Sequence, residues 1–267
     1  MNRPREPETE VDDGVRAGIT SDERQPMKDL EREVKELRRA KLLYGSLFSG
    51  IGGIDLGLDR AGLQCAWQVE IDPFARKVLE KHWPEVPKHD DIRTFNPTPV
   101  DVICGGFPCQ DISNAGKRAG IEGERSGLWS EYVRIIREVR PRFVVVENVA
   151  ALLVRGIGRV LGDLAESGYD AEWDVLRASR FGAAHRRERV FIVAYPSGNR
   201  VEGRVLSTVS QQLPRVGDKG YRFTVTEPIG VGTDHGIPSY VDRVRACGNA
   251  VVPYIAQWIG RRLIESV

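Results

Sequence analysis

The chain has little of what marks a membrane, secreted or zinc-binding protein. Its longest apolar runs, 143–146 and 190–195, are far shorter than the roughly 20 residues that a helix needs to span a bilayer. Its first residues lack the charged, apolar and small-residue order of a secretion signal. The cysteines are scattered, without the short paired spacing of a zinc site (Cys65, Cys104, Cys109 and Cys247). We therefore expect a cytoplasmic protein with reduced thiols, no membrane association and no metal.

The net charge of +1 is close to zero, but the charges are unevenly distributed along the chain. From Arg177 to the C-terminus there are 14 basic against 7 acidic residues, whereas the first 176 residues hold 25 against 31. A basic C-terminal third indicates a polyanionic partner on one side of the molecule. A solvated surface that is simply rich in arginine would give the same count, so the charge alone leaves both interpretations open.

The N-terminal segment differs from the rest of the chain. Residues 1–27 are rich in Asp, Glu, Arg and Pro, a composition that predicts a disordered charged tail. Within residues 28–41, Leu30, Val34 and Leu37 recur at helical spacing and predict one short amphipathic helix. Three apolar positions are too few to predict a coiled-coil seam.

From Leu42 onward, short apolar runs alternate with helical patterns. This alternation predicts an α/β fold with a mainly parallel sheet and helices on both faces. The expected strands are 42–48, 64–70, 100–105, 143–147, 173–178 and 190–195. The expected helices are 54–61, 73–82, 127–139, 157–167 and 251–264, the last of which should pack back against the first part of the fold. Residues 196–240 break the pattern and predict a small irregular region.

One segment carries a candidate nucleophile. The run Gly105-Gly106-Phe107-Pro108-Cys109-Gln110 directly follows an apolar strand. Glycines allow a sharp turn, proline stiffens the backbone, and ligands gather at the carboxyl ends of strands in open α/β sheets. A thiol held there is a candidate for covalent catalysis, although Pro-Cys alone is a common dipeptide.

A second segment indicates a nucleotide-type cofactor. The glycine-rich run Phe48-Ser49-Gly50-Ile51-Gly52-Gly53 follows the first strand and opens the first helix, where backbone N–H groups are available to a ligand. Glu70 ends the second strand, where a carboxylate can accept from ribose hydroxyls, and Asp91 follows the next strand and could take an adenine amino group. Single carboxylates of this kind are also common as surface residues or helix caps, and the loop alone does not separate NAD from other adenosine ligands.

A third set of residues suits acid catalysis. Glu147 comes at the end of a buried strand, so desolvation should raise its pKa and allow it to hold a proton near neutral pH. A structural role as a loop cap is the alternative. Arg187 and Arg189 alternate onto one face of an extended segment, so their guanidinium groups can converge on one anion or carbonyl.

Together these segments resemble the DNA (cytosine-5)-methyltransferase family. In chain order, the similar blocks are FSGIGGIDLGL, GGFPCQDIS, ENV, HRRERVFIVA and RACGNAVVP, which cover most of 42–267. The resemblance implies a Rossmann-like methyltransferase fold in which 42–195 and 241–267 form the catalytic and cofactor-binding domain. It implies that 196–240 is a short target-recognition region.

The resemblance also implies the reaction and its residues. The enzyme would flip a cytosine out of the duplex, add Cys109 to carbon 6 of the ring, and transfer a methyl group from S-adenosylmethionine to carbon 5. The implied catalytic residues are Cys109, Glu147, Arg187 and Arg189. The implied cofactor residues are Phe48, Ser49, Gly50, Gly52, Gly53, Glu70, Ile71, Asp91, Ile92, Gly106, Pro108, Leu128, Asn249, Ala250 and Val251. The implied DNA contacts are Gln110, Ser113, Lys117, Arg118 and Arg125.

Two features depart from the family pattern. His185 stands where the family has Gln, which puts that amide's hydrogen bond in question, although His can also donate and accept. The recognition segment is short, which affects sequence discrimination more than catalysis. We expect a monomer, encoded by a bacterium or phage, that acts on double-stranded DNA. Whether a companion restriction endonuclease exists is left open.

Three other functions would account for part of the sequence. A non-catalytic DNA-binding relative has no chemical reason to keep Cys109, Glu147, Arg187 and Arg189 together. An RNA cytosine-5 methyltransferase would share the fold and is separated by its substrate. An NAD-dependent oxidoreductase is suggested by the glycine loop alone, but the second half of a dinucleotide fold is missing.

Overall fold

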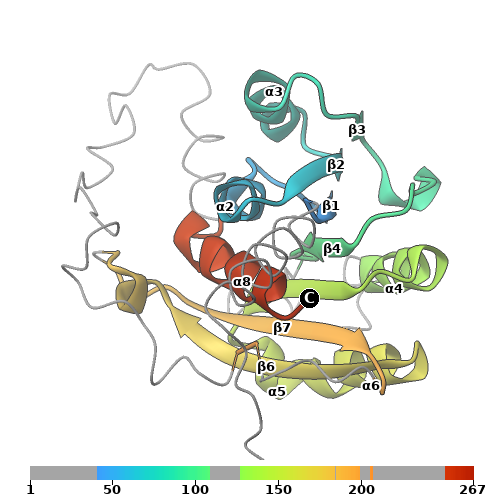
Figure 1. Cartoon of the computed structure of the whole chain (residues 1–267), viewed down its shortest axis with the longest axis vertical. Coiled ribbons are helices and arrows are strands. Elements are labelled where there is room, and N and C mark those ends of the chain that lie inside the picture. The colour runs from blue at the N-terminus through green and yellow to red at the C-terminus, as the bar shows by residue number, and fades with distance from the viewer. Residues whose placement is uncertain (1–40, 109–126, 184, 199–204, 207–249) are drawn as a thin grey trace, which may run out of the picture. The chain divides into compact units, whose positions relative to one another are not determined.

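The computed structural model describes residues 41–108, 127–183, 185–198, 205–206 and 250–267 (Figure 1). The predicted tail and amphipathic helix lie outside the described residues except for Lys41, and so does most of the predicted target-recognition region. The expectations for those segments stay predictions.

A single sheet of seven strands forms the centre of the described fold, in the order β3-β2-β1-β4-β5-β7-β6. Strands β1 to β5 run parallel to one another, while β7 pairs antiparallel with both β5 and β6. The prediction of a mainly parallel sheet is confirmed. The strands are β1 (Leu43–Leu47), β2 (Gln64–Val69), β3 (Lys88–His89), β4 (Val102–Gly105), β5 (Phe143–Val149), β6 (Tyr169–Arg177) and β7 (Glu188–Pro196).

Helices cover both faces of the sheet, as the alternating pattern predicted (Figure 1). Proline at the first position of α3 and the Asp72 side chain, which accepts from Phe74 N and Ala75 N, fix the start of that helix. The helices are α2 (Gly53–Ala61), α3 (Pro73–His82), α4 (Leu128–Val139), α5 (Leu152–Arg155), α6 (Ile157–Glu166) and α8 (Pro253–Glu265), with 3-10 turns η1 (Ile92–Thr94) and η3 (Ala178–Phe181).

Alternate residues of the central strands divide between two hydrophobic clusters, one on each face. In β5, Val145 belongs to the cluster that includes α2 and α8, whereas Val144 and Val146 belong to the one that includes α4, α5 and α6. Because both faces are covered, the central strands are apolar throughout rather than alternating with polar residues.

Helix α8 packs back against α2, as predicted, and two glycines allow the close approach. A Cβ on Gly57 would lie 2.3 Å from the Pro253 carbonyl oxygen, and one on Gly260 would lie 2.8 Å from the Ala61 Cβ. The last segment of the chain is thereby held beside the helix that the glycine-rich loop opens (Figure 1).

Several boundaries differ from the predicted ones because tertiary pairing sets them. Strand β5 continues past Glu147 to Val149, β6 begins at Tyr169, and α8 begins at Pro253. Val205 and Leu206, which the pattern assigned to the irregular region, are buried in the α2/α8 cluster. The backbone N–H of Val205 donates to a Glu172 carboxylate oxygen at 2.6 Å. In the described part of the chain, no helix is long and apolar enough to cross a membrane.

Candidate active site

The predicted functional segments meet at one edge of the sheet. The glycine-rich loop (residues 48–53) follows β1, Glu70 follows β2, and residues 106–108 follow β4. Glu147 lies within β5, two residues before the end of that strand. These strands are parallel, so their carboxyl ends lie on the same side.

The glycine-rich loop leaves its backbone open to a ligand. Phe48, Gly50 and Gly52 all have positive φ values of 53°, 56° and 82°. A Cβ on Gly50 would have no atom within 4 Å among its surroundings, whereas one on Gly53 would lie 2.6 Å from the Val251 carbonyl oxygen. Glycine at 53 therefore lets Val251, a predicted cofactor residue 198 positions away, reach the loop.

Glu70 holds the other side of this loop. Its carboxylate accepts from Gly50 N at 2.7 Å and from Asp72 N at 2.8 Å, and burial raises its pKa. The neighbouring Ile71 side chain is 63% exposed, which is unusual for isoleucine and offers an apolar surface beside a carboxylate. An open glycine backbone, a carboxylate and an exposed apolar side chain suit the ribose and ring of an adenosine group, so these residues fit the predicted cofactor.

Asp91 and Ile92 have local structural roles. Asp91 caps η1 by accepting from Arg93 N, and its carboxylate lies 2.7 Å from Arg93 Nη2. The hydrogen bonds from Arg93 lower the Asp91 pKa. Ile92 is buried in the hydrophobic cluster that includes α4, α5 and α6. The helix-cap alternative for Asp91 is thus realised, and its contact with an adenine amino group stays a prediction.

The residues before Cys109 are held tightly against β5. Strand β4 ends at Gly105, and a Cβ on Gly106 would lie 2.6 Å from Glu147 Oε2. Asn148 Nδ2 donates to the Phe107 carbonyl at 3.4 Å, and the Phe107 ring lies 5.1 Å from that of Trp129. Glycine at 106 therefore lets the glutamate carboxyl group lie directly against the loop that leads to the candidate nucleophile.

Glu147 is paired with an arginine across the sheet. Arg189 Nε lies 2.9 Å from Glu147 Oε1, and Glu147 is only 8% exposed. Burial raises the pKa of Glu147 to about 7, although the charges of Arg189 and Arg187 lower it. Burial and the nearby Arg189 lower the pKa of Arg187. The raised pKa of Glu147 agrees with the expectation from the sequence, and the charges of both arginines act on this carboxyl group, although a contact is seen for Arg189 alone among the described contacts of Glu147.

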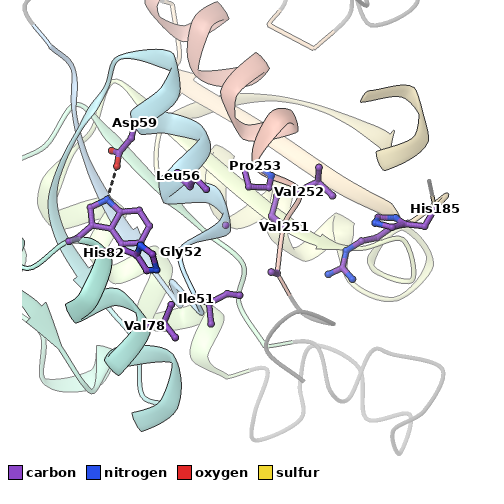
Figure 2. Close-up of a pocket in the computed structure, with 14 residues that line it drawn as sticks. Ile51, Gly52, Leu56, Asp59, Val78, His82, His185, Val251, Val252 and Pro253 are labelled. Atoms are coloured by element: carbon purple, nitrogen blue, oxygen red, sulfur yellow. Dashed lines mark hydrogen bonds between the residues drawn. The ribbon is translucent and has the colours of Figure 1, made fainter. Parts of the chain in front are cut away.

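A cavity of about 530 Å³ extends from Arg187 along the glycine-rich loop, and Figure 2 shows the residues that line it. Predicted cofactor residues Gly52, Gly53, Ala250 and Val251 line it together with Arg187 and His185. In Figure 2 the segment Val251–Pro253 lies between His185 and His82. Residues that sequence reasoning missed also line the cavity (Ile51, Leu56, Asp59, Val78, His82, Trp83, Val252 and Pro253). Two of these lining residues are hydrogen-bonded to each other, since Trp83 Nε1 donates to the Asp59 carboxylate at 2.6 Å.

The remaining predicted site residues lie beside or outside the ranges that the structure describes. Pro108 is the last described residue before a gap, and Leu128 is half-buried at the start of α4, next to the far side of that gap. Within the described ranges, no three His, Cys, Asp or Glu side chains are arranged to hold a metal ion. The residues outside the described part are Cys109, Gln110, Ser113, Lys117, Arg118, Arg125 and Asn249.

Comparison with known proteins identifies related sequences. The sequence profile of the family described as C-5 cytosine-specific DNA methylase matches residues 43–227. The Type II methyltransferase M.BsuFI of Bacillus subtilis is 37% identical over 168 residues, which are 60% of this chain and 41% of that protein. The Type II methyltransferase M.NgoFVII of Neisseria gonorrhoeae is 33% identical over 214 residues, which are 76% of this chain and 52% of that protein. The chain thus spans about half the length of the curated relatives it matches.

Solved structures show the same fold. The crystal structure of the S. pombe Dnmt2 methyltransferase superposes with a TM-score of 0.55 at 21% identity, covering 67% of this chain and 58% of that one. At this level of identity the likeness concerns the fold, and it agrees with the observed sheet and helices.

Proposed function

Because the chain belongs to the family of C-5 cytosine-specific DNA methylases, we propose that it transfers a methyl group from S-adenosylmethionine to carbon 5 of cytosine in double-stranded DNA. The observation that carries the proposal is the buried Glu147 carboxyl group, which Arg189 contacts at 2.9 Å and which lies against Gly106. Glu147, an acid with a pKa of about 7, therefore lies beside the backbone segment that leads to Cys109.

S-Adenosylmethionine supplies an activated methyl group when bound. The chain's own residues would hold it: the glycine-rich loop through its open backbone, Glu70 through its carboxylate, and Ile71 through its exposed apolar side chain. Ala250 and Val251 would close the opposite side, since Val251 already contacts Gly53. The adenine contact of Asp91 and the contacts of Asn249 belong to the same proposal.

Cys109 is proposed as the nucleophile because carbon 5 of cytosine is a poor nucleophile until the ring is activated. The thiolate adds to carbon 6, forming an S–C bond, and the ring electrons shift toward N3 and carbon 5. Carbon 5 would then take the methyl group as the S–CH3 bond of S-adenosylmethionine breaks, which leaves S-adenosylhomocysteine with the bonding electron pair. A base removes the carbon 5 proton, and the S–C bond to Cys109 breaks as the ring double bond re-forms. The target carbon is inside the base stack, so the nucleotide must be flipped out of the duplex, at a cost of roughly a few kcal/mol.

Glu147 acts as the acid in this scheme. A carboxyl group with a pKa of about 7 is about half protonated at neutral pH, so it can donate to N3 as negative charge develops there. Arg189 orients the carboxyl group, and Arg187 adds a second positive charge beside it. The 110–126 segment, with Gln110, Ser113, Lys117, Arg118 and Arg125, is proposed to contact the DNA.

We infer the cellular setting from the relatives. The two curated relatives named above are bacterial Type II methyltransferases, so we infer a bacterial or phage-encoded enzyme of the cytoplasm. We also propose that it acts as a monomer and that a restriction endonuclease of the same specificity accompanies it.

The test compares three substrates with the full chain and labelled S-adenosylmethionine. Mixed-sequence duplex DNA should accept label, tRNA should not, and a duplex with 5-fluorocytosine at the methylated site should become covalently linked to the protein. Bisulfite sequencing of the methylated duplex identifies that site beforehand. Cys109→Ser should abolish both transfer and linkage while still binding S-adenosylmethionine. Transfer to tRNA alone, or full transfer by Cys109→Ser, would contradict the proposal.

A further inference from the structure

A buried carboxylate lies beneath the glycine-rich loop and has no part in the mechanism above. Asp55, in the first turn of α2, is 0% exposed. Its Oδ2 accepts from Ser46 Oγ at 3.1 Å, and its Oδ1 accepts from Gln68 Nε2 at 2.8 Å. Ser46 and Gln68 are paired neighbours on β1 and β2. One carboxylate therefore joins α2 to both strands that lead into the cofactor loop and Glu70.

The two partners of Asp55 lead directly to the loop. The Ser46 carbonyl accepts from Ser49 Oγ at 3.2 Å, and the carbonyl of Val69, next to Gln68, accepts from Ser49 N at 3.1 Å. Glu70 comes next and accepts from Gly50 N at 2.7 Å. Ser49 and Gly50 are thus held by Ser46, which is itself a partner of Asp55, and by Val69 and Glu70, which directly follow the other partner, Gln68.

The charge environment of Asp55 is not that of a structural ion pair. The titratable groups that face it are Tyr44 on β1, Asp59 on α2, Cys65 on β2 and Cys104 on β4, and no Lys or Arg of the described residues pairs with it. The first turn of α2 favours a negative charge, which offsets part of the cost of burial. Burial nevertheless raises the pKa of Asp55 to about 6, so the group is mostly ionised at neutral pH. An apolar side chain would be the less costly choice for stability alone.

We propose that Asp55 is a positioning residue for the cofactor, which holds the glycine-rich loop, through Ser46 and Gln68, in the form that binds S-adenosylmethionine. The inference rests on the proposed function only for the identity of the ligand. Asp55 itself does not have to touch the cofactor.

A conservative substitution separates positioning from simple core stability. Among the described residues, Gln68 Oε1 is buried without a hydrogen-bond partner. If the Gln68 amide turns over, this oxygen can accept from the NH2 group that Asp55→Asn introduces, while the new amide oxygen still accepts from Ser46. Asp55→Asn can therefore keep both connections, and Asp55→Ala can keep neither.

The matched control is Tyr169→Phe. It removes a buried hydrogen bond of 2.8 Å from the Tyr169 hydroxyl to the Pro141 carbonyl, on the opposite face and away from the loop. The Tyr169→Phe variant should have a lower melting temperature and an unchanged affinity for the cofactor. It therefore shows how a loss of stability alone affects cofactor affinity.

The experiment measures S-adenosylmethionine affinity by calorimetry and hydrogen exchange of the 48–53 amides in the cofactor-free protein. Asp55→Ala should weaken binding at least tenfold and speed exchange of these amides, whereas Asp55→Asn should stay within about threefold of the wild type. If Asp55→Ala does not fold, Ser46→Ala serves instead and should weaken binding three- to tenfold with faster loop exchange.

Two results would overturn the inference. One is wild-type affinity and loop exchange in the alanine variant that folds, and the other is an equal loss of affinity in Tyr169→Phe. A wild-type protein that does not bind S-adenosylmethionine would instead contradict the proposed function. In that case the exchange data still decide whether Asp55 holds the loop.

Discussion

Arg189 Nε lies 2.9 Å from Oε1 of Glu147, across the antiparallel pair formed by β5 and β7. In the register of this pair Arg189 is opposite Val149, two residues beyond Glu147, so the two side chains lie on the same face. Burial and the arginine charge act on the carboxyl group in opposite directions, and the resulting pKa is about 7. The pair thereby holds an acid whose protonation changes in the physiological range.

Glu147→Gln should lower the methyl-transfer rate by roughly a hundredfold or more, because an amide cannot supply the acidic proton. The same change should raise the melting temperature at pH 8 and leave it nearly unchanged at pH 4, below the ordinary pKa of 4.5. Thermal melts at both pH values and single-turnover methylation would measure this. Glu138→Gln, an exposed change in the ion pair with Arg134, should alter neither property.

The sign of this stability effect follows from proton linkage. Between pH 4.5, the ordinary pKa, and about 7, folded Glu147 binds a proton that the unfolded chain does not. The contribution of this group to stability is therefore fully present below the ordinary pKa and is lost as pH rises to about 7. The loss amounts to roughly 3 kcal/mol. A melting temperature at pH 8 that is lower in Glu147→Gln than in the wild type would contradict this explanation.

Removing the arginine should move the acid's titration upward. In Arg189→Met the charge that lowers the Glu147 pKa is gone, so the alkaline fall of the methylation rate should shift to higher pH. The rate at its optimum should drop roughly tenfold or more, since the carboxyl group is no longer oriented. A pH profile of single-turnover rates provides the measurement. Arg177→Met, which breaks an exposed ion pair with Glu188, should leave the profile where it is.

The overall fold could be predicted from local pattern because both faces of the parallel strands are buried. Runs such as 143–146 are apolar throughout, and Pro73 and the glycine-rich loop mark where helices begin. The two-residue strand β3 has no such signal, since only its pairing with β2 defines it.

The contacts inside the site could not be predicted in the same way. The sequence places Arg187 and Arg189 on one face, but the partner of Arg189 depends on the register between strands that are about 40 residues apart. Asp55 shows the same limit, because a polar residue in an amphipathic helix is usually exposed and only tertiary packing buries it.

DNA affinity should fall steeply with salt if the basic C-terminal third contacts phosphates. Each phosphate neutralised contributes a slope of roughly −0.9 to the plot of log affinity against log salt. For an interface with at least four such contacts, affinity should fall roughly a hundredfold or more between about 50 and 200 mM salt. Fluorescence anisotropy with a labelled duplex measures the slope. A slope near zero would contradict the inference that the basic C-terminal third contacts DNA phosphates.

Gly106→Ala tests whether the glutamate must lie against the loop that leads to Cys109. The added Cβ would lie 2.6 Å from Glu147 Oε2, too close for any real contact, so the carboxyl group or the loop has to move. The rate of methyl transfer should fall at least tenfold, because a shift of the acid or of the loop weakens both proton transfer from Glu147 and attack of Cys109 on the base. Gly162→Ala is the matched control, since a Cβ there meets nothing within 4 Å on helix α6. That control should stabilise the protein by roughly 1 kcal/mol through helix propensity and leave activity unchanged. Equal activity in the two variants would show that the contact between the loop and Glu147 does not matter for catalysis.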